Sequence, residues 1–333
     1  MEAKREYHTI LKGTSVADVL EKERAFLEEH PGASPLIKRW FLSSPEAQQA
    51  EIPHAGGAVS VIGQSPLDAS AAALWIWCAE GMDIEYRPGI TIAKADGLEH
   101  WFRANMTAPG CTSADQTDGI LREYEEFLVS NGMDIEKNCV RTWFFCNDID
   151  NNYAGLVKAR RENFELHGLT AGTHYIASTG IAGVPYDGSI VQMDAWAVKG
   201  RLVQRYLYAP THLNPTSEYG VTFERGVRLD WGGKSHCIIS GTASIDNKGA
   251  VLHTGDAAAQ TRRMLENVGK LLEEGGAGFG DIRSASVYLR NASDYKAVND
   301  ILATALEAVP YVVTLAPVCR PAWLVEMECI AIV

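Results

Sequence analysis

The sequence predicts an α/β (α+β) protein with two tandem domains, each a mixed sheet covered on one face by two helices. Two observations support this prediction. Helix-like and strand-like segments alternate from about residue 115 to the C-terminus. Their order in the middle of the chain then recurs at its end, so two units of one pattern are expected.

The first helices of the two units begin alike and have similar lengths. Asp115-Gln116-Thr117 opens an amphipathic stretch that ends near residue 132, and Gln260-Thr261 opens another that ends near residue 276. We therefore expect equivalent helices at about 115–132 and 258–274. Apolar residues recur at helical spacing in both stretches: Ile120, Tyr124, Phe127 and Leu128 in the first, and Met264, Val268, Leu271 and Leu272 in the second.

The remaining elements follow in the same order in both units. Strand-like runs rich in β-branched and aromatic residues cover 138–146 and 281–290. Asx and Ser capping residues then precede second helices at about 154–167 and 295–308. Strand candidates near 173–198 and 310–333 complete the units.

The repeat also predicts the domain boundaries. One domain is expected over 56–199 and a second over 200–333, with the boundary near Lys199-Gly200. Residues 1–55, which contain Pro31-Gly32, Pro35 and Pro53, are expected to form an N-terminal arm packed on the repeat.

Composition excludes several classes of protein. Hydrophobic residues make up 46% of the chain and charged residues 22%, which is typical of a packed globular protein. The net charge of −12 repels polyanions, so no nucleic-acid partner is expected. The N-terminus has no apolar signal region and no window is apolar enough to span a membrane, so we expect a cytoplasmic protein with no membrane partner.

Cysteine spacing indicates neither a disulfide framework nor a metal site. The chain has seven cysteines, an odd number, and no C-x-x-C pair. Its nine histidines include no H-x-x-x-H spacing. We therefore expect no bound metal.

The C-terminal motifs resemble those of the YjgF/Rid (endoribonuclease L-PSP) family. Such domains have a chorismate mutase-like fold and commonly form trimers around pockets at their interfaces, which implies a homo-oligomer unless the tandem chain makes those contacts internally. The matching motifs are Ser240-Gly241-Thr242-Ala243-Ser244, Gly255-Asp256, Gln260-Thr261, Leu265-x-Asn267, Val287-Tyr288-Leu289 and the closing strand from Leu324 to Ala331.

Motifs further upstream resemble chorismatases, two-domain relatives of the Rid fold that hydrolyse chorismate. The resemblance implies a small anionic metabolite as substrate and no cofactor. It makes Glu326 the catalytic residue and Arg225, Arg320, Tyr219, Arg141, Cys319, Ser178 and Thr179 the substrate-binding residues. The matching motifs are Arg141-Thr142-Trp143, Asp148-Ile149, Tyr153, Arg160 with Phe164, the run from Ala177 to Ile181, Tyr219-Gly220 with Phe223-x-Arg225, and Cys319-Arg320-Pro321.

One departure from the Rid pattern bears on the reaction. Simple Rid deaminases hold the carboxylate of an imine with an Arg upstream of the Glu that aligns with Glu326, whereas residues 310–315 contain no Arg. A chorismatase-like hydrolase is therefore the leading hypothesis. The alternatives are a Rid-type imine or enamine deaminase and a non-catalytic metabolite-binding protein.

The two glutamates of the last strand have two interpretations. In an extended strand Glu326 and Glu328 share one face with apolar residues, where lost solvation would raise the pKa of a carboxyl and suit it to act as a general acid. From spacing alone, cross-strand ion pairs or a solvated edge explain both glutamates better. With the resemblance, Glu326 is expected to be catalytic and Glu328 structural.

The other candidates also have competing explanations. Arg141 shares a strand face with aromatic residues, which suits either an anion contact or a surface arginine. Ser178 and Thr179 fit a substrate contact or an ordinary end of a strand, and Cys319 fits pocket shaping better than nucleophilic attack. A solvated helix position is expected for Arg160.

Overall fold

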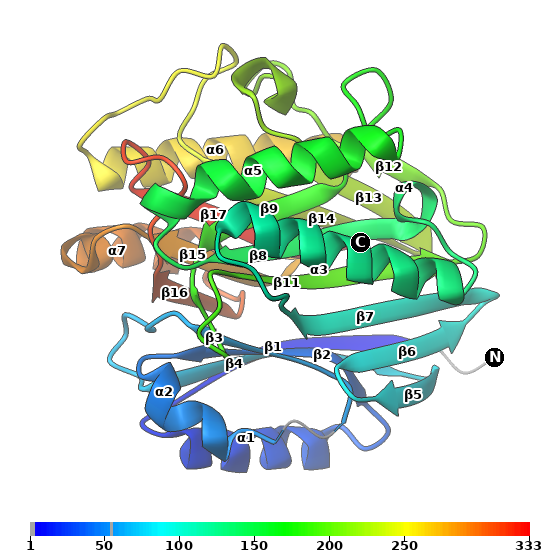
Figure 1. Cartoon of the computed structure of the whole chain (residues 1–333). Coiled ribbons are helices and arrows are strands. Elements are labelled where there is room, and N and C mark those ends of the chain that lie inside the picture. Colours follow the sequence, from blue (N-terminus) through cyan, green and yellow to red (C-terminus); the bar gives the residue numbers. More distant parts are fainter. Residues whose placement is uncertain (1–3, 54–55) are drawn as a thin grey trace.

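The computed structural model describes residues 4–53 and 56–333, with the side chain of Tyr219 outside the description. Over these residues the strands form three mixed sheets, and the long helices lie on the outside of the molecule (Figure 1). The strand orders are β1-β4-β2-β3-β10, β5-β6-β7-β11-β8-β9 and β12-β13-β14-β17-β15-β16.

The first sheet belongs to the N-terminal part of the chain. Its elements are β1 (Arg5–Gly13), α1 (Val16–Glu29), β2 (Ser34–Leu42), α2 (Pro45–Gln48), the 3₁₀ turn η1 (Gln49–Glu51), β3 (Ala58–Gly63) and β4 (Ala72–Glu80), joined by β10 (Val184–Pro185).

The second sheet and its helices follow directly. They are β5 (Asp83–Arg87), β6 (Ile90–Ala95), β7 (Leu98–Met106), α3 (Ser113–Ser130), α4 (Ile135–Asn138), β8 (Cys139–Cys146), α5 (Ile149–Leu166), β9 (Ala177–Ala182) and β11 (Val191–Lys199).

The third sheet contains the C-terminal strand. Its elements are β12 (Gln204–Tyr206), η2 (Thr216–Tyr219), β13 (Gly226–Trp231), β14 (Lys234–Ala243), α6 (Ala257–Gly275), η3 (Phe279–Asp281), β15 (Ile282–Leu289), η4 (Ala292–Asp294), α7 (Tyr295–Ala305), β16 (Tyr311–Leu315) and β17 (Val325–Ile332).

Local signals set the ends of the two equivalent helices α3 and α6. Thr112 and Asp115 form a capping box at the start of α3, and the Asp256 carboxylate accepts a hydrogen bond from the Ala259 amide at the start of α6. Gly276 ends α6 in the left-handed region, at φ 78°, which glycine adopts without strain. Both helices lie within two residues of their predicted ranges.

The tandem repeat predicted from the sequence is confirmed by strand pairing. In the second sheet β7 pairs with β11 and β11 with β8 antiparallel, whereas β8 pairs with β9 parallel. In the third sheet β14, β17, β15 and β16 pair in the same order and with the same directions. The elements from α3 to β11 therefore correspond to those from α6 to β17.

A third copy of the pattern occupies the N-terminal part of the chain. There β1 pairs with β4 and β4 with β2 antiparallel, and β2 pairs with β3 parallel. Residues 1–55 were expected to form an arm, but β1 and β2 instead share a sheet with β3 and β4 from beyond residue 55. The division of the chain into domains over 56–199 and 200–333 stays a prediction.

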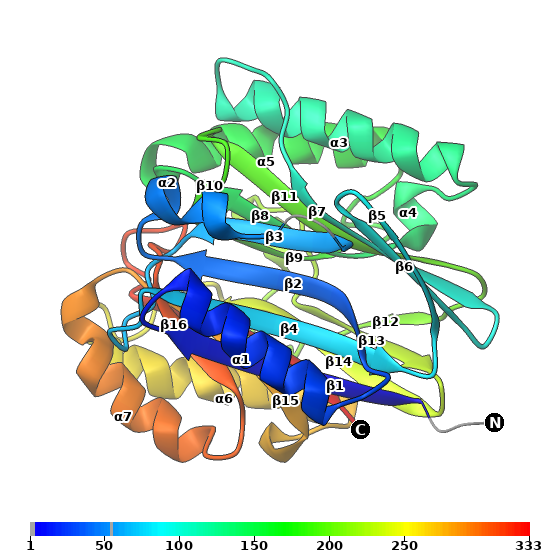
Figure 2. The same cartoon turned by 90° about the horizontal axis from the view of Figure 1, so that it is seen from below.

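Contacts between neighbouring repeats close into a ring. Figure 2 shows the first repeat in front, with α3 and α5 of the second repeat above it and α6 and α7 of the third below it. Strand β3 of the first repeat contacts β7 of the second, β9 of the second contacts β14 of the third, and β15 of the third contacts β1 of the first. Backbone hydrogen bonds support the last junction: the Leu67 amide donates to the Val313 carbonyl and the Leu315 amide to the Ser65 carbonyl. One apolar core with residues from all three repeats fills the ring.

Large aromatic side chains connect the first and second repeats within this core. The rings of Trp77 and Trp196 lie 5.2 Å apart and edge-on, and Phe102 stacks on Trp196 at 5.3 Å.

Among the helices of residues 4–53 and 56–333, none is long and apolar enough to cross a membrane.

Candidate active site

The candidate site is a cavity where β9 of the second repeat packs against β14 of the third. In its present shape the cavity encloses about 30 Å³, which is room for little more than a water molecule. Its polar lining residues are Arg160, Arg225, Arg320, Glu326, Tyr153, Ser178, Thr179 and Cys319, and its apolar lining includes Val221, Phe223, Ile245 and Trp323.

Glu326 is the acid in this cavity. It lies on β17 between Ala243 of β14 and Tyr288 of β15, and only 5% of the residue is exposed. Burial raises the pKa of its carboxyl from 4.5 to about 8, helped by the negative charge of Glu328 and opposed by Arg141 and Arg225. At neutral pH Glu326 is therefore a protonated acid with a proton to give.

Two buried arginines face the cavity from different elements. Arg160 of α5 donates from Nε to Thr222 Oγ1 at 3.2 Å, and its guanidinium lies 5.6 Å from the ring of Phe144. Arg225 precedes β13 and donates to the carbonyl oxygen of Asn214 from Nε at 2.9 Å and from Nη2 at 2.7 Å. Each cation is thus held in a defined position before any ligand binds.

Arg320 and Cys319 also line the cavity. Arg320 is half-buried and its guanidinium lies 5.2 Å from the ring of Trp323. Burial, together with the nearby charge of Glu326, raises the pKa of the Cys319 thiol to about 12. The thiol therefore stays protonated near neutral pH, which suits it to shape the pocket and not to attack as a thiolate.

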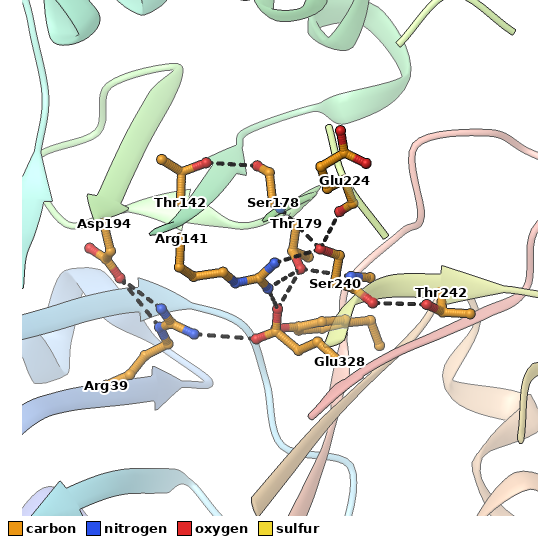
Figure 3. Close-up of polar contacts among 12 residues, drawn as sticks. Arg39, Arg141, Thr142, Ser178, Thr179, Asp194, Glu224, Ser240, Thr242 and Glu328 are labelled. Atoms are coloured by element: carbon orange, nitrogen blue, oxygen red, sulfur yellow. Dashed lines mark hydrogen bonds and ion pairs between the residues drawn. The ribbon is translucent and has the colours of Figure 1, made fainter. Parts of the chain in front are cut away.

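Arg141 is not among the lining residues of the cavity, and Figure 3 shows its polar contacts. Its guanidinium donates to Ser240 Oγ at 2.9 Å, to Thr179 Oγ1 at 2.5 Å and to Glu328 Oε2 at 2.6 Å. Thr179 Oγ1 also accepts a hydrogen bond from the Gly241 amide at 2.9 Å. Arg141 therefore holds Thr179 in place, and Thr179 and Gly241 form part of the cavity wall.

The structure brings most of the predicted site residues together. Glu326, Arg225, Arg320 and Cys319 line one cavity with Ser178 and Thr179, whereas Arg141 does not line it and contacts its lining residue Thr179. The side chain of Tyr219 lies outside the described part of the chain. The roles of these residues in substrate binding stay predictions.

Arg160 corrects the expectation of a solvated helix charge. Only 1% of it is exposed, because it lies four residues after Leu156 and four before Phe164, both buried on the same face of α5. That i, i+4 spacing was the sequence signal that placed Arg160 on the inner face. The loss of solvation is offset by its hydrogen bonds and by its contact with Phe144.

The ring has two further junctions, and neither places a carboxyl at the position of Glu326. Each of the strand pairs β8–β11, β15–β17 and β2–β4 has one register shift. When the pairs are aligned at this shift, the residue equivalent to Glu326 is Gln192 in β11 and Ala73 in β4. At the junction of the first two repeats, Asn105 takes the position of Gly241 and its Oδ1 accepts from Gln192 Nε2 and from the Val61 amide, both at 2.8 Å. At that junction a hydrogen-bonded asparagine side chain therefore stands where the candidate site has a glycine.

No metal site accompanies the cavity in the part of the chain that the structure describes. Over residues 4–53 and 56–333 no group of three or more His, Cys, Asp or Glu side chains is arranged to hold a metal ion.

Comparison with known proteins gives two kinds of likeness. Residues 233–333 match the family model described as endoribonuclease L-PSP. The chain is 38% identical over 65 residues to 3-aminoacrylate deaminase RutC of Acinetobacter baylyi. The aligned segment covers 20% of this chain and 52% of RutC. The chain thus spans about half the length of this curated relative.

Likeness to a solved structure extends over the whole chain. The crystal structure of a chorismatase superposes with a TM-score of 0.73 and 19% sequence identity, and the match covers 99% of each chain. In overall fold the chain therefore resembles a chorismatase, and its C-terminal part resembles the endoribonuclease L-PSP (YjgF) family, as its motifs had indicated.

Proposed function

We propose that the protein is a chorismatase-like hydrolase that cleaves the enol ether of chorismate and releases pyruvate. The observation that carries this proposal is a buried, protonated Glu326 in a cavity that also holds Arg160, Arg225 and Arg320. The fold shared with a chorismatase supports it. No metal or organic cofactor has a step in this reaction.

The charges of the cavity suit a dianion. Chorismate carries two carboxylates, and three guanidinium groups line a cavity in a chain whose net charge is −12. Guanidinium groups bind carboxylates through paired hydrogen bonds, which fixes orientation as well as charge. A small anionic metabolite is therefore the proposed ligand, whereas the homo-oligomer implied by the resemblance stays a prediction.

Glu326 would supply the proton for the chemical step. Its O–H proton bonds to the methylene carbon of the enol ether, the C=C electron pair forms the new C–H bond, and the carboxylate left behind stabilises the oxocarbenium ion. Water then adds to the cationic carbon and gives one proton back to the Glu326 carboxylate. The hemiketal collapses by breaking the bond between its central carbon and the ether oxygen, and this oxygen takes up the proton and stays on the ring as a hydroxyl group. The products are pyruvate and a dihydroxycyclohexadiene carboxylate, or a hydroxybenzoate where no water is retained overall.

Binding requires the cavity to enlarge. Its volume of about 30 Å³ is far below that of a ten-carbon ligand, whereas a neighbouring pocket of about 380 Å³ shares Arg225 with it. Arg225 is tied to Asn214, which lines that second pocket. We expect a ligand carboxylate to compete with the Asn214 carbonyl for Arg225 and to move this wall.

A second candidate function follows from the relative RutC, whose name is 3-aminoacrylate deaminase. An enamine is also protonated on carbon, so the same acid suits that reaction. Against this, β16 lacks the arginine that simple Rid deaminases have in this region. A non-catalytic binding protein would use the same arginines without turnover.

The deciding experiment measures pyruvate release from chorismate by purified protein, followed as NADH oxidation with lactate dehydrogenase. Release by the wild type that is lost in Glu326→Gln supports the proposal. Equal release by both proteins contradicts the role of Glu326. If the wild type releases no pyruvate, ammonia release from 3-aminoacrylate favours the deaminase, and binding of 3-hydroxybenzoate without any turnover favours the binding protein.

A further inference from the structure

Four buried charged side chains meet at the centre of the ring (Figure 3). Arg39 comes from β2 of the first repeat, Arg141 and Asp194 from β8 and β11 of the second, and Glu328 from β17 of the third. Arg39 and Arg141 are 1% exposed, Asp194 0% and Glu328 6%. When all four are charged, the two cations and the two anions balance.

Arg39 connects the two acids of this group. Its Nη2 lies 3.0 Å and its Nε 3.3 Å from Asp194 Oδ2, and its Nη1 lies 3.4 Å from Glu328 Oε1. Its guanidinium is also held among aromatic rings, 4.8 Å from Trp143 and 4.9 Å from Phe145. The cation therefore has a fixed position.

Glu328 links Arg39 to Thr179 in the cavity wall. Its Oε1 also accepts from the Tyr288 hydroxyl at 2.9 Å, and its Oε2 accepts from Arg141 Nη2 at 2.6 Å and Thr179 Oγ1 at 2.5 Å. Thr179 lines the cavity, and its Oγ1 accepts a hydrogen bond from the Gly241 amide beside Glu326. A continuous chain of contacts thus links Asp194 and Arg39 to the wall of the candidate site.

The same group acts on Glu326 through charge. Glu328 is two residues away on the same strand face, and its negative charge is the largest cause after burial of the raised pKa of Glu326. Arg141 and Arg225 oppose it. The other titratable or charged groups that line the cavity around Glu326 are Arg160 and Tyr153 of α5 and Cys319 and Arg320 of the segment before β17.

We propose that Arg39 and Asp194 are positioning residues of the Glu326 site: Arg39, held by Asp194, fixes the carboxylate of Glu328, and Glu328 fixes the Thr179 wall beside Glu326. The N-terminal repeat thereby contributes to a site formed by the other two. The kinetic part of this inference rests on the proposed function, whereas its titration part does not.

Two single substitutions in this ion pair distinguish a charge effect from a packing effect. Arg39→Met leaves an excess negative charge, so Glu326 should keep its proton to a higher pH. Asp194→Asn leaves an excess positive charge, so Glu326 should lose its proton at a lower pH. We expect midpoint shifts of about one pH unit in opposite directions, and a double variant close to the wild type.

The titration needs no substrate. The infrared band of the protonated carboxyl is assigned to Glu326 by its absence in Glu326→Gln, and its loss with rising pH is followed in each variant. Lys38→Met is the matched control: it removes one cation from the residue next to Arg39, but Lys38 points to the other face of β2 and pairs with Glu23 at 2.7 Å. Its Glu326 midpoint should equal that of the wild type.

Shifts in the same direction in both variants, or no shift in either, would overturn the inference. If Arg39→Met does not fold, Asp194→Asn decides, because its midpoint must fall. Where chorismate is turned over, the pH profile of pyruvate release should move with the infrared midpoint. A protein that releases no pyruvate but shows the opposite shifts contradicts the proposed function and leaves the positioning role supported.

Discussion

Gly241 of β14 packs directly against the carboxyl of Glu326. A Cβ atom at position 241 would stand 2.2 Å from Glu326 Oε1 and 2.8 Å from its Cδ, closer than real contacts allow. The absence of a side chain at this position therefore fixes where the acid sits. At the junction of the first two repeats the corresponding residue is Asn105, whose side chain bonds to Gln192 instead.

Gly241→Ala should impair catalysis more than folding. The added methyl group must push the Glu326 carboxyl away from its position, and a displacement of about 1 Å in a catalytic group can reduce the rate about a hundredfold. We expect pyruvate release to fall by that order. Gly280→Ala, where a Cβ meets no atom within 4 Å, is the control and should retain full activity. Equal rates in the two variants would contradict the contact.

Glu326→Gln should abolish most turnover and keep ligand binding. The amide is nearly isosteric and still forms hydrogen bonds, but it has no acidic proton to transfer to carbon. Loss of a general acid typically costs about a hundred- to ten-thousand-fold in rate. Pyruvate release and calorimetric binding of 3-hydroxybenzoate measure the two effects separately. A variant that loses both in equal measure would indicate a structural role for Glu326.

The rate should fall at alkaline pH. Glu326 acts in its protonated form, and its pKa is raised to about 8 by burial and by the charge of Glu328. The protonated fraction is therefore nearly complete at pH 6 and decreases tenfold per pH unit well above pH 8. The pH dependence of kcat/KM for pyruvate release, which reports ionisation of the free protein, tests this. A rate that rises through pH 8 would identify a base and contradict the assignment.

Arg225→Ala should weaken binding before it affects the chemical step. Arg225 is a buried cation that lines the cavity, and a hydrogen bond from a charged group contributes about 1.5–3 kcal/mol, or roughly a ten- to hundredfold change in affinity. We expect KM to rise by that factor with a smaller change in kcat. Arg122→Ala removes an exposed arginine of α3 that pairs with Asp118 and should leave both constants unchanged.

The parts of the fold that local patterns encode were predictable from the sequence. The two equivalent helices and the strands after them follow from apolar spacing and caps, and they lie close to their predicted ranges. The N-terminal repeat was missed because Pro31, Pro35 and Pro53 suggested an irregular segment. Pro35 in fact lies in β2 at a shift in its register with β4, where a missing amide is tolerated.

Side chains that converge from different repeats were not predictable in the same way. Arg39, Asp194 and Glu328 are far apart in sequence, and no periodicity within one strand indicates that they meet. Burial of Arg160 was readable from its spacing to Leu156 and Phe164, but the usual preference for a solvated arginine outweighed that signal. Glu326 was found through its motif, since alternation alone favoured an ion pair.

Two histidines, His8 of β1 and His100 of β7, predict a loss of stability in acid. His8 stacks on Trp77 with 4.9 Å between ring centres, and the ring of His100 lies 4.4 Å from that of Trp231. Burial lowers the pKa of each imidazole from 6.5 to about 3, so both are neutral in the folded protein.

The direction of the pH effect follows from where the protons bind. The unfolded chain takes up a proton at each histidine below about pH 6.5, whereas the folded protein does not until about pH 3, so stability falls as the pH is lowered between these values. From pH 7 to pH 5 each histidine should cost about 2 kcal/mol of unfolding free energy. His100→Gln should reduce this pH dependence by that amount in urea unfolding, whereas the exposed His253→Gln should not. An unchanged difference between pH 7 and pH 5 in His100→Gln would show that His100 is already charged in the folded state.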